Sequence, residues 1–146
     1  MSIQPITILV IDDNPTDIMI MSEALKSTKV QVDLRTACDG ISGLEFLRRM
    51  GPNTDAPRPD LILLDLNMPR KNGHEVLAEI KADEVLRTIP VVMLTTSQSE
   101  DDLAKAYAAH VNCYIRKPVD FEKFVQVVSS IEDFWFAVVS LPSICD

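Results

Sequence analysis

Cysteine and histidine are scarce in this chain. The three cysteines, Cys38, Cys113 and Cys145, are odd in number and far apart. Zinc sites need paired ligands at short spacings, so these residues predict no such site. We expect reduced thiols packed as small apolar residues. His74 and His110 are too few and too scattered for zinc chemistry or a phosphohistidine relay, and no role is predicted for either.

Glycine and basic residues are also few. The only glycines are Gly40, Gly43, Gly51 and Gly73, and they form neither a dinucleotide fingerprint nor a P-loop. This spacing disfavours a nucleotide-binding domain. The 14 basic side chains are outnumbered by 22 acidic ones, for a formal charge of −8. Such a charge repels phosphate backbones, so we expect no nucleic-acid partner.

Long apolar runs are missing from the N-terminal part of the chain. The run at residues 6–11 is closed by Asp12 and Asp13, and no basic region precedes it. Neither a secretion signal nor a membrane span fits this pattern. We therefore expect a cytoplasmic protein without a membrane partner. The 146 residues predict a single domain over 1–146, with a C-terminal helical, apolar extension at about 138–146.

What the chain does contain is an alternation of short apolar runs and helical patterns. Strands are predicted at 6–11, 32–37, 61–64, 89–94 and about 113–115. Helices are predicted after the capping residues Asn14 with Pro15, Asp39, Ser99 and Asp120, and a further helix is predicted from about Gly73. Parallel neighbours need helical crossovers, so this order predicts an α/β fold with a doubly wound, five-stranded parallel sheet.

Apolar spacing predicts which side of each helix packs on the sheet. The buried positions expected from this spacing are Ile18, Met21 and Leu25 in the first helix, Ile41, Leu44 and Leu47 in the second, and Val76, Leu77 and Ile80 in the third. Residues 51–59 hold three prolines and a glycine, which indicates an exposed connection.

Polar side chains follow four of the predicted strands. Asp12 and Asp13 end the first strand, Asp65 the third, Thr95 the fourth and Lys117 the fifth. Ligands of doubly wound sheets bind beyond the carboxyl ends of the strands, at the switch point in strand order. Carboxylates that converge there repel one another, and either a proton or a divalent cation relieves the repulsion. Oxygen ligands without histidine or cysteine favour Mg²⁺.

A metal ion beside a carboxylate, a lysine and a threonine hydroxyl suits phosphoryl transfer. The cation and the lysine neutralise phosphoryl oxygens, and the hydroxyl donates a hydrogen bond to one of them. The nucleophile expected from this arrangement is Asp65, which would form an aspartyl phosphate.

This set of residues resembles the receiver domain of two-component response regulators, a CheY-like family, over residues 6 to about 137. The intervals from Asp65 to Thr95 and Lys117 agree with that family, and Tyr114 precedes the lysine. The resemblance implies that Asp65 takes a phosphoryl group from a sensor histidine kinase. It also implies that Asp13, Asp65 and the backbone carbonyl of Asn67 hold Mg²⁺, and that Asp12 assists through water.

The same resemblance implies a conformational signal. Lys117 would pair with the acceptor and then with the phosphoryl oxygens, Thr95 would move toward the phosphoryl group, and Tyr114 would turn inward. The surface of the fourth helix, fifth strand and fifth helix would change with them. Such a protein is not an enzyme for other substrates, because it catalyses only its own phosphorylation and dephosphorylation.

Two other functions stay open from the sequence. A Mg²⁺-dependent phosphatase of the haloacid dehalogenase type also uses a strand-end aspartate, but it needs a second aspartate where this chain has Asn67. A receiver-like scaffold that works without phosphate is the other alternative, although every residue of the acceptor site is present.

The C-terminal part of the chain is more apolar than one helix face requires. Its predicted helix has a seam that would pack on the sheet: Phe121, Phe124, Val128, Ile131, Trp135 and Val138. Further apolar residues lie off this seam, which favours a homodimer through the helix and extension over a tail folded back on its own core.

The proline-rich loop and this tail also make the chain resemble single-domain regulators that partner bacterial and cyanobacterial phytochrome histidine kinases. Contacts with the kinase are expected on the first helix around Asp17, Ile18 and Met21, beside residues 118–119.

Overall fold

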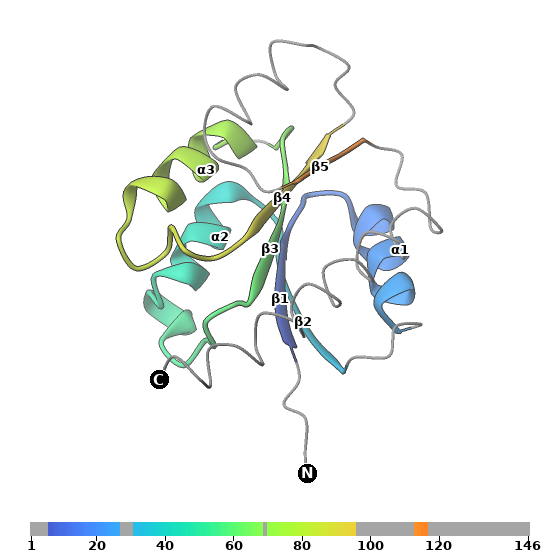
Figure 1. The fold of residues 1–146 in the computed structure, drawn as a ribbon, viewed down its shortest axis with the longest axis horizontal. Helices are drawn as coiled ribbons and strands as arrows, with labels where there is room; N and C mark the ends of the chain where they lie inside the picture. The colour runs from blue at the N-terminus through green and yellow to red at the C-terminus, as the bar shows by residue number, and fades with distance from the viewer. Residues whose placement is uncertain (1–5, 27–30, 69, 96–112, 117–146) are drawn as a thin grey trace, which may run out of the picture.

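The computed structural model describes residues 6–26, 31–68, 70–95 and 113–116. Five parallel strands form one sheet in the order β2-β1-β3-β4-β5, with helices on both faces (Figure 1). The strands are β1 Ile6–Ile11, β2 Val32–Ala37, β3 Leu61–Asp65, β4 Val91–Thr95 and β5 Cys113–Arg116. The helices are α1 Pro15–Lys26, α2 Gly40–Leu47 and α3 Gly73–Ala82, with a short 3-10 helix, η1, at Gly51–Asn53. This arrangement confirms the predicted doubly wound α/β fold.

Some predicted elements fall elsewhere. The helices expected after Ser99 and Asp120, with the apolar seam, lie outside the described residues. Among the helices that are described, none combines the length and the hydropathy that crossing a bilayer requires.

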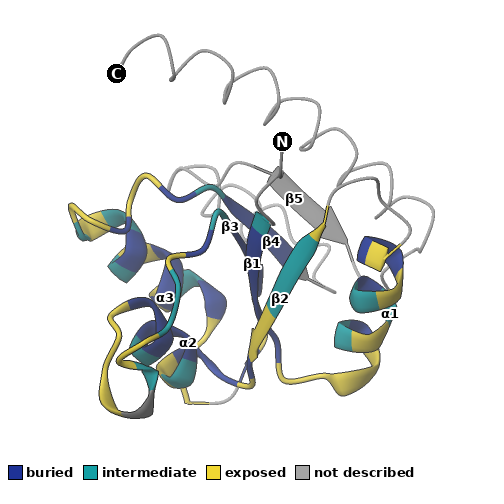
Figure 2. Cartoon of the chain, turned by 90° about the horizontal axis from the view of Figure 1, so that it is seen from below, coloured by how far each residue is buried: buried dark blue, intermediate teal, exposed yellow. Residues whose placement is uncertain are grey.

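The sheet separates two apolar cores. Alternate residues of β1 point to opposite faces, so Leu9 and Ile11 pack in the core beneath α2 and α3, whereas Ile8 and Val10 pack beneath α1. The strands β3 and β4 divide in the same way. Figure 2 shows β1 buried after its first residue and β2, at the sheet edge, partly exposed. The first strand is therefore covered on both faces of the sheet, as expected for a short, continuous run of apolar residues.

Side-chain caps fix the start of each helix near the carboxyl edge of the sheet. The Asn14 Oδ1 atom accepts hydrogen bonds from the backbone N–H groups of Thr16 and Asp17, at 2.9 and 3.3 Å. The Asp39 Oδ1 atom accepts from Ser42 N at 2.7 Å and caps α2. These bonds satisfy N–H groups that have no partner within the helix, as the sequence predicted at Asn14 and Asp39.

The third helix begins with a capping box. The Asn72 side chain accepts from the backbone N–H of Glu75, and the Glu75 side chain accepts from that of Asn72. The helix starts at Gly73, as predicted.

The structure corrects three details. β4 begins at Val91 rather than Ile89, because Ile89 N donates to Leu86 O in a turn and Pro90 has no N–H for the ladder. Ile41 was expected to face the core but is 38% exposed. Cys38 was expected to be buried but is exposed, because it follows β2 at the sheet edge.

The proline-rich loop is less free than predicted. Gly51, Thr54, Asp55 and Arg58 in this loop, residues 51–59, are exposed, whereas Asn53, Ala56 and Pro57 are half-buried and Pro59 is buried. The Arg49 Nε atom also donates to Ala56 O at 2.9 Å, and this bond ties the loop to the end of α2.

Candidate functional site

The order of the strands creates a switch point between β1 and β3. The chain passes from β1 through α1 to β2 on one side, and then through α2 to β3 on the other side of β1. Right-handed crossovers put the two connecting helices on opposite faces, which leaves a crevice where these strands end. Asp12 follows β1, and Asp65 is the last residue of β3.

Three carboxylates converge in this crevice. One carboxylate oxygen each from Asp12, Asp13 and Asp65 lies within 4.8 Å of the others. Asp12 is 0% exposed and Asp65 is 2% exposed, whereas Asp13 is exposed to solvent. Three negative charges at this separation repel strongly, and a hard divalent cation is the ligand that removes the repulsion. The structure thus brings together the three carboxylates predicted at the strand ends, and their role as metal ligands stays a prediction.

Backbone hydrogen bonds hold the two buried acids in place. The Asp12 Oδ1 atom accepts from Asn14 N at 2.9 Å, and Asp12 N donates to Ala37 O at 3.0 Å. The Asp65 Oδ1 atom accepts from Asn67 N at 3.4 Å, a long bond that turns the chain after β3. Asn67 is exposed and lies two residues after Asp65. Its predicted role as a metal ligand through its backbone carbonyl stays a prediction.

Gly73 lets α3 start directly against the acceptor strand. A Cβ atom built at this position would lie 2.4 Å from Asp65 O and 2.7 Å from the Cα atom of Leu66. Both neighbours are backbone atoms that cannot rotate away, so a side chain here would displace the acceptor. The backbone N–H of Gly73 also donates to Leu66 O at 2.8 Å, which closes the loop between β3 and α3.

An ion pair connects this loop to the neighbouring α2 cap. Arg70 donates to the Asp39 carboxylate, whose side chain is 5% exposed, while that of Arg70 is 62% exposed. Arg70 has a φ of 66°, a left-handed conformation that is costly for a residue with a Cβ atom. The sequence predicted Asp39 only as a cap, because its partner lies 31 residues further along the chain.

We expect the negative charge of Asp39 to stabilise the folded state at neutral pH and to lose this effect at acidic pH. The backbone N–H of Ser42 lowers the pKa of Asp39 against the opposing effect of burial, and Arg70 lowers it further. A lowered folded-state pKa stabilises the protein above the unfolded value near 3.9, and this stabilisation is lost as pH falls through the folded-state pKa. Asp39→Asn should therefore unfold about 1 kcal/mol more easily than wild type at pH 7.

Urea denaturation at a series of pH values measures this difference. It should be constant between about pH 5 and 7 and should shrink below about pH 4. Asp33→Asn is the matched control, because its own side chain and that of its partner Arg35 are 37% and 46% exposed, so solvent screens this pair far more than that of Asp39. If the free energy of unfolding of Asp39→Asn still differed from that of wild type by the same amount at low pH, the charge of Asp39 would not be the cause of the difference.

The other predicted site residues lie on the neighbouring strands. Thr95 is the last residue of β4, which pairs with β3, and it is paired with Arg116 of β5. Tyr114 lies within β5, opposite Met93. Lys117 lies outside the described residues, directly after the last residue of β5. The backbone thus places β4 next to the strand of Asp65 and β5 one strand further away. The roles of the Thr95, Tyr114 and Lys117 side chains stay predictions.

Part of the predicted kinase surface is wrong in detail. Met21 is 0% exposed and Asp17 is 8% exposed, because both face inward from α1. Met19, by contrast, is 63% exposed on the same helix. A partner that docks on α1 would therefore meet Met19 rather than Met21.

Comparisons with known proteins agree with the fold and the acid cluster. Residues 8–129 match the response regulator receiver domain family. The chain belongs to this family, so it is a receiver domain of two-component signalling, and the phosphatase hypothesis loses its basis.

The relatives include regulators from phytochrome systems. The chain is 44% identical to the response regulator Rcp1 of Synechocystis sp. over 139 residues, covering 95% of each chain. Its fold is similar to that of the phosphorylated cyanobacterial phytochrome response regulator RcpA, with a TM-score of 0.82, 46% identity and coverage of 92% of this chain and 96% of that one. It is also similar to the Mn²⁺-bound form of Rcp1, with a TM-score of 0.80, 44% identity and coverage of 90% and 94%.

Proposed function

We propose that this chain is a response regulator in which Asp65 accepts a phosphoryl group from a phosphohistidine of a sensor kinase, in a Mg²⁺-dependent reaction. The observation that carries the proposal is the cluster of Asp12, Asp13 and Asp65, with two of the three buried at the ends of adjacent strands. A carboxylate in this position is both a nucleophile and a metal ligand. The Mn²⁺-bound form of the related Rcp1 supports a divalent cation here.

The transfer needs few groups from this chain. An Asp65 carboxylate oxygen attacks phosphorus as the bond from phosphorus to the kinase imidazole nitrogen breaks, and the imidazole keeps the electron pair of that bond. Asp12 and Asp13 fit a cation that would neutralise the phosphoryl oxygens when bound. The backbone bonds to Asp12 and Asp65 fix the carboxylates before the reaction, so little reorganisation is needed.

The remaining residues take the roles that the family implies. The Asn67 carbonyl would complete the metal site, and Lys117 would bind the phosphoryl oxygens after pairing with the acceptor. Thr95 moves toward the phosphoryl group, and Tyr114 turns inward, which changes the output surface. Hydrolysis of the aspartyl phosphate by water ends the signal. The chain thus catalyses only its own phosphorylation and dephosphorylation.

The relatives suggest partners for this regulator. Rcp1 and RcpA, together with the bacteriophytochrome response regulator RtBRR, which is 38% identical, support a phytochrome histidine kinase as the phosphoryl donor. We further propose a single cytoplasmic receiver domain over residues 1–146 that forms a homodimer through its C-terminal helix and extension. A phosphate-independent scaffold is the alternative function for the same fold.

Incubation with acetyl phosphate tests the proposal. With Mg²⁺, intact mass spectrometry should show a gain of one phosphoryl group per chain, and with excess EDTA the gain should disappear. A gain that EDTA leaves unchanged would contradict the metal dependence. No gain under any condition would support the scaffold, and sustained turnover of p-nitrophenyl phosphate without a labelled intermediate would support a phosphatase.

A further inference from the structure

A second hollow lies at the opposite edge of the sheet from the acid cluster. It has a volume of about 330 Å³, within the range of ligand sites. Its lining comes from the end of α2, the loop before β3 and the loop before β4: Leu47, Arg48, Arg49, Arg58, Pro59, Asp83, Val85 and Leu86. β3 runs from this edge at Leu61 to the acceptor at Asp65, about 13 Å away at the usual rise of a strand. Both sites can therefore be occupied together.

The wall of this hollow is basic in a protein of net charge −8. Three of its lining residues are arginines, and one, Asp83, is acidic. Arg48 is paired with Glu79 at 3.2 Å, so Arg49 and Arg58 supply the local excess of positive charge. Asp83 is engaged, because its Oδ1 atom accepts from the backbone N–H groups of Val85 and Leu86 at 2.8 and 3.2 Å. The local excess of positive charge favours an anion.

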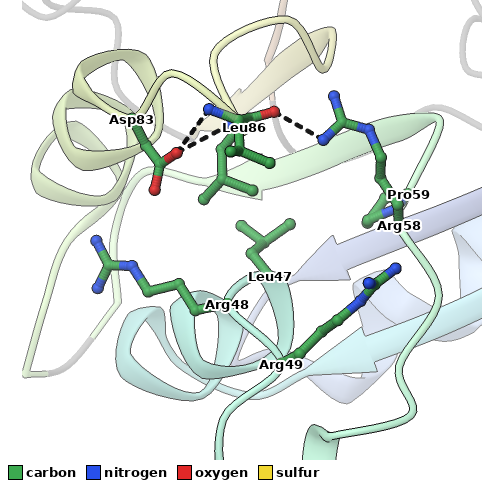
Figure 3. A pocket seen from close by; sticks show the side chains of 8 residues that line it. Leu47, Arg48, Arg49, Arg58, Pro59, Asp83 and Leu86 are labelled. Carbon is green, nitrogen blue, oxygen red and sulfur yellow. Dashed lines mark hydrogen bonds between the residues drawn. The ribbon is translucent and has the colours of Figure 1, made fainter.

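The arginines keep donors for such an anion. Arg58 is held across the hollow by bonds to Val85 O at 2.7 Å and Thr88 Oγ1 at 2.8 Å. Arg49 uses its Nε atom on Ala56 O, and Arg48 donates to Glu79 at 3.2 Å. A guanidinium has five N–H donors, so these contacts leave several on each side chain. Figure 3 shows Arg48 on one side of the hollow and Arg49 and Arg58 on the other.

The floor is apolar. Leu47 and Leu86 point toward each other between the arginines, and Pro59 closes one side (Figure 3). These three residues are buried, whereas Val85 at the rim is 67% exposed. A ligand that fits both parts carries a large apolar group directly beside a negative charge.

We propose that this hollow, the arginine cavity, binds an acidic and apolar segment of a partner polypeptide, with an apolar side chain against Leu47 and Leu86 and a carboxylate on the arginines. A peptide fits better than a small metabolite because half of the lining residues are exposed, so the hollow is open on one side. Small-ligand sites enclose most of their ligand. The exposed Val85 extends the apolar contact beyond the hollow, as an interface requires. The inference does not depend on phosphorylation of Asp65.

NMR titration of the full ¹⁵N-labelled chain tests it. The probe is a capped eight-residue peptide with a central leucine flanked by glutamates, and two matched peptides replace the glutamates with glutamine or the leucine with serine. The backbone amides of Leu47, Val85 and Leu86 are the local reporters. We expect saturable shifts there with the first peptide and at least fivefold weaker binding of either matched peptide.

Variants separate the cavity from general charge effects. Arg49→Gln should weaken binding by about threefold to fivefold, and Val85→Glu by at least as much, since it adds a negative charge at the rim. Arg35→Gln is the control, because this exposed arginine lies on β2, away from the cavity, and it should bind like wild type. Phosphorylation by acetyl phosphate should be unchanged in Arg49→Gln.

Several results would overturn the proposal. Wild type without saturable shifts at the reporter amides would remove the site. Equal binding of the glutamine peptide would remove the role of charge. Hexanoate or inorganic phosphate that bound as tightly as the peptide would show a small-anion site instead.

Discussion

Asp65→Asn should take up no phosphoryl group from acetyl phosphate or from a phosphorylated kinase. The asparagine amide occupies nearly the same volume as the carboxylate but is a poor nucleophile, so the fold stays while the acceptor is lost. Asp65 is 2% exposed at the end of β3. Among the described residues, Asp12 is the one other buried carboxylate of the acid cluster. Intact mass spectrometry measures the loss as the absence of the phosphorylated species.

The control for this variant sits at the other end of the same strand. Asp60 precedes β3 and accepts from Thr7 N at 2.9 Å, far from the metal cluster. Asp60→Asn should therefore be phosphorylated like wild type. Equal labelling of Asp65→Asn and wild type would contradict the assignment of the acceptor.

Asp13→Asn should weaken Mg²⁺ binding by about 10-fold to 100-fold, because it removes one of three negative charges around the cation. An asparagine oxygen still coordinates a metal, so the loss reports charge rather than geometry. Asp13 is exposed, and its replacement should not disturb the fold. Solvent screening at this exposed position keeps the expected loss below that of a buried charge.

Competition between Mg²⁺ and Mn²⁺, followed by electron paramagnetic resonance, measures the affinity. Asp55→Asn is the matched control, because it removes the same charge from the exposed loop at the opposite edge of the sheet. Affinity of Asp13→Asn within twofold of wild type would show that Asp13 is not a ligand and that the cation, if bound, rests on the two buried acids.

Much of the site could be predicted because each strand end is marked in the sequence. An apolar run that stops at Asp12 or Asp65 fixes both the strand and the position of the carboxylate. Parallel order then brings those ends together without any knowledge of side-chain contacts. The caps at Asn14 and Asp39 are local patterns of the same kind, and the structure shows both, whereas the capping box at Asn72 was not predicted.

What could not be predicted depends on contacts between distant segments. The pairing of Arg70 with Asp39 and the gathering of Arg48, Arg49 and Arg58 around Leu86 follow from how the loops pack, which no local pattern encodes. The solvent exposure of single side chains also differs from the prediction. Cys38 lies at the end of an edge strand and Met21 on the inner side of α1, and composition alone distinguishes neither.

Chemical mapping of the phosphorylated residue tests the account most directly. Borohydride reduces an acyl phosphate to the alcohol, so wild type phosphorylated with acetyl phosphate and Mg²⁺ should yield homoserine in place of aspartate at position 65 in tandem mass spectra. The unphosphorylated protein should yield aspartate there. Homoserine at another position, or a stable phosphate on a histidine or serine, would contradict the phosphoacceptor role of the acid cluster.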